Sequence, residues 1–393
     1  MTVDLRVIRN DASIRARRRT SQSIRVLPTI VQPIVEPLET VVARSIDELD
    51  RRQWDSLFLT ELEDWRYLRT LERSRLEGCE PVYFGIRSRG RLVAAVPAFV
   101  GRLALTEPWR ARSRSQWRRA SERSLVLGSP FAAACRIGFT PRATPEEQVL
   151  LLDRLLRAAR DESARRGLDG FELSCDDAVL GGVYQQRGES MALERTPGAA
   201  MARLQLPRWS FADYLSCFDE ALRGQLLGVC AQAGQYERDS RVDLARDLEP
   251  MLSLCREAGL DEIGKGFFKE MLGSDPRRMA CLLVRDRDGG LAGFSIALHD
   301  AHALVEKLTV VSRREKAALV RGMLWLETLR FCLQHGLAVY ESASALALSA
   351  ARPSELRQSW RWVATAEAAA APAAQSQADA RSPRNGRLGP SQR

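Results

Sequence analysis

The residues with the most distinctive chemistry in this chain are its cysteines and histidines, and their spacing argues against a metal site. Cysteine occurs at positions 79, 135, 175, 217, 230, 255, 281 and 332, and no two of these form a Cys-x-x-Cys pair. The close histidine pair His299-x-x-His302 falls in a predicted strand–turn–strand, where residues three apart do not share a face. A Cys/His cluster of standard metal-ligand spacing is absent, so we predict no metal.

The same residues also make weak nucleophiles. Cys175 and Cys281 would act as nucleophiles only beside a histidine or another activating group, and nothing in the sequence places one there. Cys281 and Cys332 sit inside apolar stretches, where a free cysteine behaves as a small hydrophobic residue. The chemistry of this protein must therefore come from other side chains, and the elements that position them come next.

Length and composition are those of a globular protein with two domains. The chain has 393 residues, of which 45% are hydrophobic and 28% charged. No apolar run approaches the roughly 20 residues needed to cross a membrane, and two prolines break the apolar stretch near the N-terminus. We expect a cytoplasmic protein without a membrane span; the sequence does not indicate its oligomeric state.

The net charge of +9 is unevenly distributed. Arginine exceeds acidic residues by seven to three in 1–36, by six to one in 110–123, and by four to two in 364–393. The basic excess therefore lies in two tails and one insert, which we interpret as solvated segments, with a nucleic-acid surface as the alternative. We predict a disordered basic leader at 1–40, folded lobes at 41–206 and 207–363, and a disordered tail at 364–393.

A long-period duplication decides the architecture. Pro81–Pro97 and Met279–Ser295 each read as a strand, a charged turn and a second strand. Each predicted hairpin is followed by a helix that ends in Gly-Leu and by an aromatic-Glu strand, Phe171-Glu172 in one half and Tyr340-Glu341 in the other. An antiparallel meander thus passes twice into a crossover that joins parallel strands.

Local signals predict the helices and strands between these landmarks. Ser45 with Glu48, Thr144 with Glu147, and Ser210 with Asp213 each form a capping box at a helix start. We expect helices over 47–58, 144–166, 211–232, 247–258 and 316–335, a short helix at 183–188, and strands at 125–129, 171–174, 200–206, 303–311 and 337–342.

This layout resembles tandem GNAT acyltransferases of the FemAB-like (peptidoglycan biosynthesis/recognition) type. The similarity lies in the hydrophobic pattern and order of Glu80–Phe99, Ser124–Gly138, Arg166–Ser174, Tyr184–Leu206, Phe211–Leu226 and Leu291–Glu341. It implies an α/β (α+β) fold of two GNAT-like lobes, each a mixed, mostly antiparallel sheet flanked by helices. It also implies transfer of an acyl group from acetyl-CoA or another acyl-CoA to an amine, without a metal.

The resemblance also implies where the cofactor binds. In such a fold the pyrophosphate rests on the loop and helix start after the first splayed strand, because free backbone N–H groups suit a phosphate. In the second half this segment supplies Val311, Ser312, Arg313, Arg314, Lys316, Arg321 and Gly322, with Ser312 as a helix cap. The family has Gly-x-Gly or Gly-x-Ala in this loop, and this chain has Ala317 and Ala318 where glycines are expected. The alternative to a cofactor-binding loop at 311–322 is an ordinary solvated helix start.

The catalytic candidates follow from the same resemblance. Glu306, before the loop, and Glu341, after the helix, would remove a proton from the amine, while Tyr340 or Tyr184 would return one to the leaving thiolate. Each has a structural alternative, an outward-facing strand residue or a core aromatic. A backbone N–H would hold the oxyanion.

Three functions remain open at this point. The first is an acyl-CoA-dependent N-acyltransferase acting on a small-molecule or envelope-precursor amine between the lobes. The second is a Fem-like aminoacyl-tRNA-dependent transferase, in which the basic insert 106–123 would contact phosphates. The third is a non-catalytic assembly protein that kept the fold and lost the loop.

Overall fold

The computed structural model describes residues 37–102, 123–176, 193–206, 210–342 and 354–363, except for positions 60, 133, 169, 274, 276, 314 and 315. The predicted leader up to residue 36, nearly all of the insert 106–123, the predicted helix at 183–188 and the tail 364–393 lie outside the described residues. Every described residue belongs to one unit of the chain, Ile34–Arg393.

The described elements that precede residue 206 form the first lobe, except for the last of them, β7, which pairs with the second lobe. They are β1 (Leu38–Ala43), the 3-10 helix η1 (Ile46–Glu48), α1 (Arg51–Leu57), α2 (Trp65–Ser74), β2 (Glu80–Ser88), β3 (Arg91–Arg102), β4 (Arg123–Leu127), β5 (Gly138–Phe139), α4 (Pro145–Arg165), β6 (Phe171–Asp176) and β7 (Glu194–Gln205).

The second lobe begins with helices and ends in a strand. Its elements are α6 (Phe211–Ser216), α7 (Glu220–Gln232), η3 (Ala233–Gln235), β8 (Glu237–Asp239), α8 (Leu244–Ala258), α9 (Lys265–Gly273), β9 (Met279–Arg285), β10 (Leu291–His299), β11 (Ala303–Val311), α10 (Ala317–Gln334), β12 (Val339–Ser342) and β13 (Ser354–Val363).

The capping signals work as the sequence predicts, with one difference. The boxes at Ser45, Thr144 and Ser210 each form both reciprocal hydrogen bonds. The box at Ser45, however, starts only the short η1, because the chain turns at Leu49 and α1 then starts from its own cap, Asp50. The helix predicted over 47–58 is therefore two elements.

Twelve strands follow one another in a single order, β1-β2-β3-β4-β6-β13-β7-β12-β11-β10-β9-β8, and β5 pairs with β3. Neighbours along this order are antiparallel except for two parallel pairs, β4 with β6 and β11 with β12. In both lobes a long helix, α4 or α10, joins the parallel strands, as expected for a crossover connection. The predicted duplication and the predicted fold class are confirmed.

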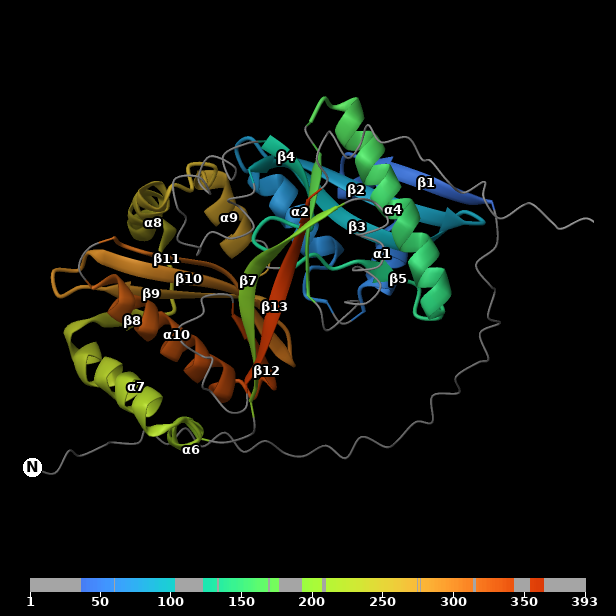
Figure 1. The fold of residues 1–393 in the computed structure, drawn as a ribbon. Coiled ribbons are helices and arrows are strands. Elements are labelled where there is room, and N and C mark those ends of the chain that lie inside the picture. The colour runs from blue at the N-terminus through green and yellow to red at the C-terminus, as the bar shows by residue number, and fades with distance from the viewer. Residues whose placement is uncertain are drawn as a thin grey trace, which may run out of the picture. The chain divides into compact units, whose positions relative to one another are not determined.

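The two central strands are exchanged between the lobes. β7 follows the first lobe in sequence but pairs with β12 of the second, and β13, from the end of the described chain, pairs with β6 of the first. β7 and β13 also pair with each other (Figure 1). The sequence predicts β7 from residue 200 onward as the closing strand of the first lobe. This assignment is wrong in its pairing, because β13 takes the place beside β6.

Helices cover both faces of each half of the sheet. Figure 1 shows α4 lying across β2 and β3, and α10 running beside β9 and β10. On the opposite faces α1, α2, α8 and α9 pack into one hydrophobic core, which draws residues from both lobes. Phe131 and Phe267 meet there with ring centroids 5.2 Å apart, and the Glu77 N–H donates to the Glu262 carbonyl at 3.0 Å. The lobes are therefore held together by apolar packing as well as by strand pairing.

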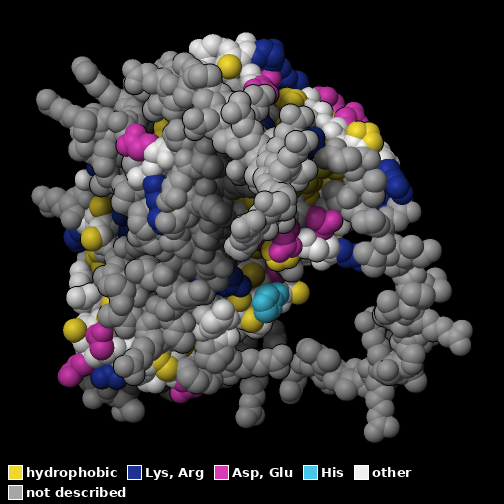
Figure 2. Space-filling model, turned by 45° about the vertical axis from the view of Figure 1, so that its right-hand side comes forward, with side chains coloured by type: hydrophobic (Ala, Val, Ile, Leu, Met, Phe, Trp, Pro, Cys, Tyr) yellow, Lys and Arg dark blue, Asp and Glu magenta, His cyan; other side chains and the backbone are white. Residues whose placement is uncertain are grey.

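The described surface carries charges of both signs. On the face shown in Figure 2, Lys and Arg side chains are scattered among Asp and Glu side chains rather than gathered into one patch. In the part of the chain that the structure describes, no helix is long and apolar enough to cross a membrane.

Candidate functional site

The parallel strands of the second lobe, β11 and β12, pair over only three residues and then separate. β11 and β12 pair from Ala303↔Val339 to Val305↔Glu341, and β11 then continues to Val311 without a β12 partner among the described residues. On its other side β11 stays paired with β10 as far as Val311. One edge of β11 is therefore released where Glu306 begins, and this opening is the centre of the candidate site.

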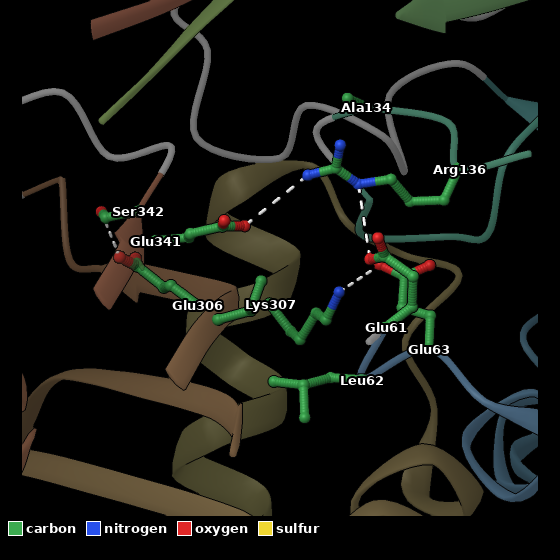
Figure 3. Close-up of a pocket in the computed structure, with 10 residues that line it drawn as sticks. Glu61, Leu62, Glu63, Ala134, Arg136, Glu306, Lys307, Glu341 and Ser342 are labelled. Carbon is green, nitrogen blue, oxygen red and sulfur yellow. Dashed lines mark hydrogen bonds and ion pairs between the residues drawn. The ribbon is translucent and has the colours of Figure 1, made fainter. Parts of the chain in front are cut away.

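A β-bulge marks this point. Along β10, Ile296 faces Leu308 and Ala297 faces Glu306, so Lys307 has no partner in the register. A bulge locally disrupts the ladder and redirects side chains. Figure 3 shows the result, because Glu306 extends toward Ser342 while Lys307 extends toward Glu63 of the first lobe.

Glu306 is surrounded by neutral hydrogen-bond donors. Its carboxylate accepts hydrogen bonds from the Ser342 hydroxyl at 2.5 Å and the Tyr340 hydroxyl at 3.2 Å, and Thr309 also bonds to it. Tyr340 is fully buried. Burial, reinforced by the nearby carboxylate of Glu306, raises the pKa of Tyr340 well above its usual value, so its hydroxyl keeps its proton. The structure thus brings two of the predicted catalytic residues, Glu306 and Tyr340, into direct contact.

Glu341, the third predicted catalytic residue, lies in ion pairs. Its carboxylate is 3.4 Å from an Arg203 nitrogen on β7 and 3.8 Å from an Arg136 nitrogen in the loop between β4 and β5. The other end of the Arg136 guanidinium is 3.5 Å from Glu61, in the loop between α1 and α2. Arg136 thus lies between carboxylates of the two lobes (Figure 3).

The pKa of the Glu61 carboxyl is raised by its surroundings. Burial raises the pKa of Glu61, while Arg136 opposes this shift and the carboxylates of Glu63 and Glu341 add to it. A carboxyl group with a raised pKa can exchange a proton nearer to neutral pH, which is a property of general bases.

These side chains line one small polar pocket with a cavity volume of about 30 Å3. Four of the lining residues are glutamates and two are cations, and the full set is Glu61, Leu62, Glu63, Ala134, Arg136, Val305, Glu306, Lys307, Glu341 and Ser342. The lining therefore has an excess of negative charge. A positively charged group such as an ammonium is favoured there.

The predicted cofactor segment lies at the other end of β11. Ser312 and Lys316 line a second cavity, of about 390 Å3, together with Tyr236, Asp286, Leu291, Ala292, Ala317 and Val320. Arg313 and Lys316 are exposed and Arg321 is half-buried, whereas Arg314 lies outside the described residues. The partly buried side chain of Val311 packs against the small core at this end of α10.

Two residues of this segment are placed differently from the expectation. Ser312 does not cap α10, because the helix starts at Ala317 with Lys316 in the cap position, and the Ser312 hydroxyl instead lies 3.5 Å from Glu257. Gly322 lies inside α10, where an added Cβ would be 3.2 Å from Val229 of α7. Its small size serves helix packing at this position, and its proposed contact with a cofactor stays a prediction.

Four charged residues of the polar pocket were not identified from the sequence. Glu61 and Glu63 belong to the run Glu61-Leu62-Glu63-Asp64, whose three acids in four residues are the signal that could have drawn attention to it. Arg136 lies in the loop between β4 and β5, and Lys307 is the bulge residue of β11. Cys281, one of the two cysteines considered as nucleophiles, is buried, and burial raises the pKa of its thiol, so it stays protonated. The side chain of Cys175 and all of Tyr184 lie outside the described residues.

Two of the three histidines, His299 and His302, take part in a turn of the second lobe. The His299 ring nitrogen Nδ1 lies 3.4 Å from the Asp300 carbonyl, and the His302 N–H donates to the Asp300 carboxylate at 2.6 Å. Among the described residues, no group of three or more His, Cys, Asp and Glu side chains is arranged to hold a metal ion.

Comparison with known proteins identifies the fold. No family model and no curated protein sequence matches the chain. Among solved structures, it is similar to a tandem GNAT protein from the clavulanic acid biosynthesis pathway, with a TM-score of 0.54 and 15% identity over 84% of this chain and 98% of that one. It is also similar to FemX, with a TM-score of 0.50 and 8% identity over 83% of this chain and 97% of that one. At this identity the comparisons show a shared fold, and they confirm the predicted tandem GNAT, FemAB-like architecture.

Proposed function

We propose that this chain is an N-acyltransferase that moves an acyl group from an acyl-CoA to an amine bound between the two lobes. The observation that carries the proposal is the position of the polar pocket. It lies where β11 leaves β12, and glutamates outnumber cations in its lining by four to two. An acyl donor held along the freed part of β11 would bring its thioester to a pocket that attracts an ammonium group.

The donor would be anchored at the far end of β11. The cavity beside Ser312 and Lys316 lies at the start of α10, an 18-residue helix whose first backbone N–H groups favour a phosphate. The exposed Arg313 and Lys316 supply positive charge. Asp286 also lines this cavity, but its carboxylate already accepts the N–H groups of Asp288 at 3.0 Å and Gly290 at 2.8 Å in its own turn.

The acceptor must lose two protons, and the pocket has groups for both. An amine arrives as an ammonium and becomes nucleophilic only after it gives up its first proton, which we assign to Glu61 because its pKa is raised. The neutral nitrogen then attacks the thioester carbonyl carbon. A backbone N–H of β11, beyond its last pair with β12, would stabilise the oxyanion that forms.

The second proton leaves as the C–S bond breaks. We assign Glu306 as the base that takes it from nitrogen and then passes it to the leaving thiolate, while Tyr340, which keeps its own proton, orients the Glu306 carboxylate through their hydrogen bond. One proton thus ends on the thiol of coenzyme A and the other passes from Glu61 to solvent. Glu341, which is held by Arg136 and Arg203, would shape the pocket for the acceptor.

The alternative donor, an aminoacyl-tRNA, depends on the basic insert 106–123, of which the structure describes only Arg123. Arg123 forms an ion pair with Glu80 of the first lobe. The cavity at the start of α10 supports acyl-CoA, which is therefore the donor that we propose.

The test is binding of the donor followed by release of its thiol. Thermal-shift titration with acetyl-CoA should raise the melting temperature, because a ligand that binds only the folded state stabilises it. Lys316→Glu should abolish the shift, and Lys269→Glu, an exposed lysine on α9, should leave it intact. No stabilisation at millimolar acetyl-CoA would count against the proposal and favour a non-catalytic protein. Primary amines that support thiol release by the wild-type chain, and not by Glu306→Gln, would identify the acceptor.

A further inference from the structure

The first lobe repeats the parallel strand pair of the second, but its opening is filled. β4 and β6 pair from Leu125↔Phe171 to Leu127↔Leu173, as β11 and β12 do, and the crossover helix α4 follows. In the second lobe the strand edge is released at the equivalent point. In the first lobe the segment that follows β4 turns back and occupies the opening between β4 and β6.

Backbone hydrogen bonds fix the filling segment, residues 128–137. The Cys135 N–H donates to the Ser174 carbonyl of β6 at 2.6 Å, directly beyond the last residue that β4 pairs with, and the Gly128 N–H donates to the Pro97 carbonyl of β3 at 2.7 Å. Gly128 has φ +117°, and an added Cβ there would lie 3.4 Å from the Cys135 Cα. The segment is thus folded tightly onto itself between β4 and β6.

Packing holds the segment in this position. Ser129, Phe131, Ala132, Ala134 and Cys135 are each 5% exposed or less. Phe131 adopts a left-handed backbone with φ +63°, which costs free energy for a residue with a side chain and persists where packing enforces it. Its ring contacts Phe267 of α9, in the core that the lobes share. Opening this segment for a pantetheine arm would break that core.

The far end of the segment belongs to the polar pocket of the second lobe. Ala134 and Arg136 line that pocket, and Arg136 is only 16% exposed. Its guanidinium lies between Glu61 and Glu341, at distances of 3.5 and 3.8 Å that are longer than direct hydrogen bonds. A loop that corresponds to the donor-binding loop of the second lobe therefore forms a wall of the second lobe's acceptor pocket.

From this arrangement we infer that the chain binds one acyl-CoA, at β11 and α10, and that the first lobe contributes Arg136 as a positioning residue instead of a second donor site. This inference rests on the proposed function of the pocket. Arg136 would act through Glu61, by holding its carboxylate toward the acceptor.

The charges around Glu61 indicate what Arg136 does to it. Glu61 is faced by Arg136 from the loop after β4, by Glu63 from its own loop, by Glu341 from β12 and by Lys307 from β11. Arg136 is the largest of the influences that lower the pKa of Glu61, and it opposes the effect of burial. Removal of Arg136 would therefore raise the pKa of Glu61. Because the base must be unprotonated to act, the acid limb of the pH–rate profile would move to higher pH.

The first test is the stoichiometry of donor binding by the full chain, measured by isothermal titration calorimetry with acetyl-CoA. We expect one site per chain, weakened at least tenfold by Lys316→Glu and unchanged by Lys269→Glu. Two sites, or one site that survives Lys316→Glu at full affinity, would overturn the inference while leaving the chain a CoA-binding protein. Absence of binding would overturn both the inference and the proposed function.

The second test is the pH profile of thiol release by Arg136→Gln and Arg136→Lys at saturating acetyl-CoA. We expect Arg136→Gln to lose at least tenfold in rate at the foot of the acid limb and much less on the plateau, and Arg136→Lys to restore part of the loss. The affinity for acetyl-CoA should stay within twofold of wild type. A uniform loss across pH, with the acid limb unmoved in both variants, would show that Arg136 only supports the wall and would overturn its role as a positioning residue.

Discussion

Replacing Lys307 with Met should destabilise the protein more than a typical substitution does, because it breaks a buried ion pair between the lobes. The Lys307 side chain is 2% exposed and pairs with Glu63, which is 13% exposed. The Glu63 carboxylate also accepts a hydrogen bond from the Ser129 hydroxyl, and the Lys307 ammonium lies 5.3 Å from the centre of the Tyr67 ring. Both charges were removed from bulk water when the lobes packed together, and each depends on the other.

The expected magnitude follows from what each substitution leaves behind. Loss of one partner of a buried pair costs about 3–5 kcal/mol, because the remaining charge is uncompensated. Lys307→Met should fall near the lower end, at about 3 kcal/mol, since Glu63 keeps Ser129 and some contact with solvent. Glu63→Leu should cost more, at about 4 kcal/mol, because it leaves the Lys307 ammonium buried without a counter-charge. The double variant Lys307→Met/Glu63→Leu leaves no buried charge, and it should be less destabilised than either single variant.

The assay is equilibrium unfolding in urea of the wild type, both single variants and the double variant, analysed as a double-mutant cycle. We expect a coupling free energy above about 2 kcal/mol. A coupling below about 0.5 kcal/mol, or two single variants that are each no worse than a surface substitution, would refute the reasoning that this pair is buried and mutually dependent.

Three further predictions test the interface of the lobes, the chemistry and the pH dependence of stability. Gly266→Ala should cost about 1–3 kcal/mol in urea unfolding, because the new Cβ would lie 2.8 Å from the Ser74 carbonyl oxygen of α2, whereas Gly273→Ala in the same helix meets nothing within 4 Å and should be neutral or stabilising. Glu306→Gln should reduce the rate of thiol release by about 100-fold or more while the affinity for acetyl-CoA is retained; an unchanged rate would remove Glu306 from the mechanism. Hydrogen bonds from Arg165 and Arg166 lower the pKa of Glu162 to about 2, so its stabilising effect is present above the unfolded-state pKa near 4.5 and is lost as the pH falls toward 2. Glu162→Gln should therefore cost about 1–2 kcal/mol at pH 7, and progressively less below about pH 4.5; a difference that does not depend on pH would contradict this assignment.

Most of the fold could be predicted because its signals are local. The capping box at Thr144 with Pro145 starts α4, and Gly167 adopts a left-handed conformation just after it ends. The strand β11 has its predicted bounds, and α10 differs from its prediction by one residue at each end. By contrast, α9 and β13 were not predicted, and the pairing of β7 was wrong. The local sequence predicts that a segment forms a strand, but it does not specify which strands it pairs with.

The residues of the candidate site likewise fall into those that the sequence could predict and those that it could not. Glu306, Tyr340 and Glu341 could be selected together because a parallel strand pair brings the corresponding ends of its strands to one place. Lys307 and Glu63 are 244 positions apart, and their contact depends on how the two lobes pack. Arg136 was missed for the same reason, since its role arises from a loop that belongs to one lobe and serves the pocket of the other. The predicted domain boundaries, at residues 206 and 363, stay a prediction.

The exchange of β7 and β13 has a consequence for how this protein is made. A ribosome releases the first lobe long before it synthesises residues 354–363, yet among the described strands it is β13 that pairs with the outer edge of β6. Until then the emerging chain exposes an unpaired strand edge, which is prone to mispairing. Completion of the first lobe must therefore wait for β13. A fragment of residues 37–206 should stay sensitive to proteolysis, and a stably folded fragment of this length would contradict this order of events.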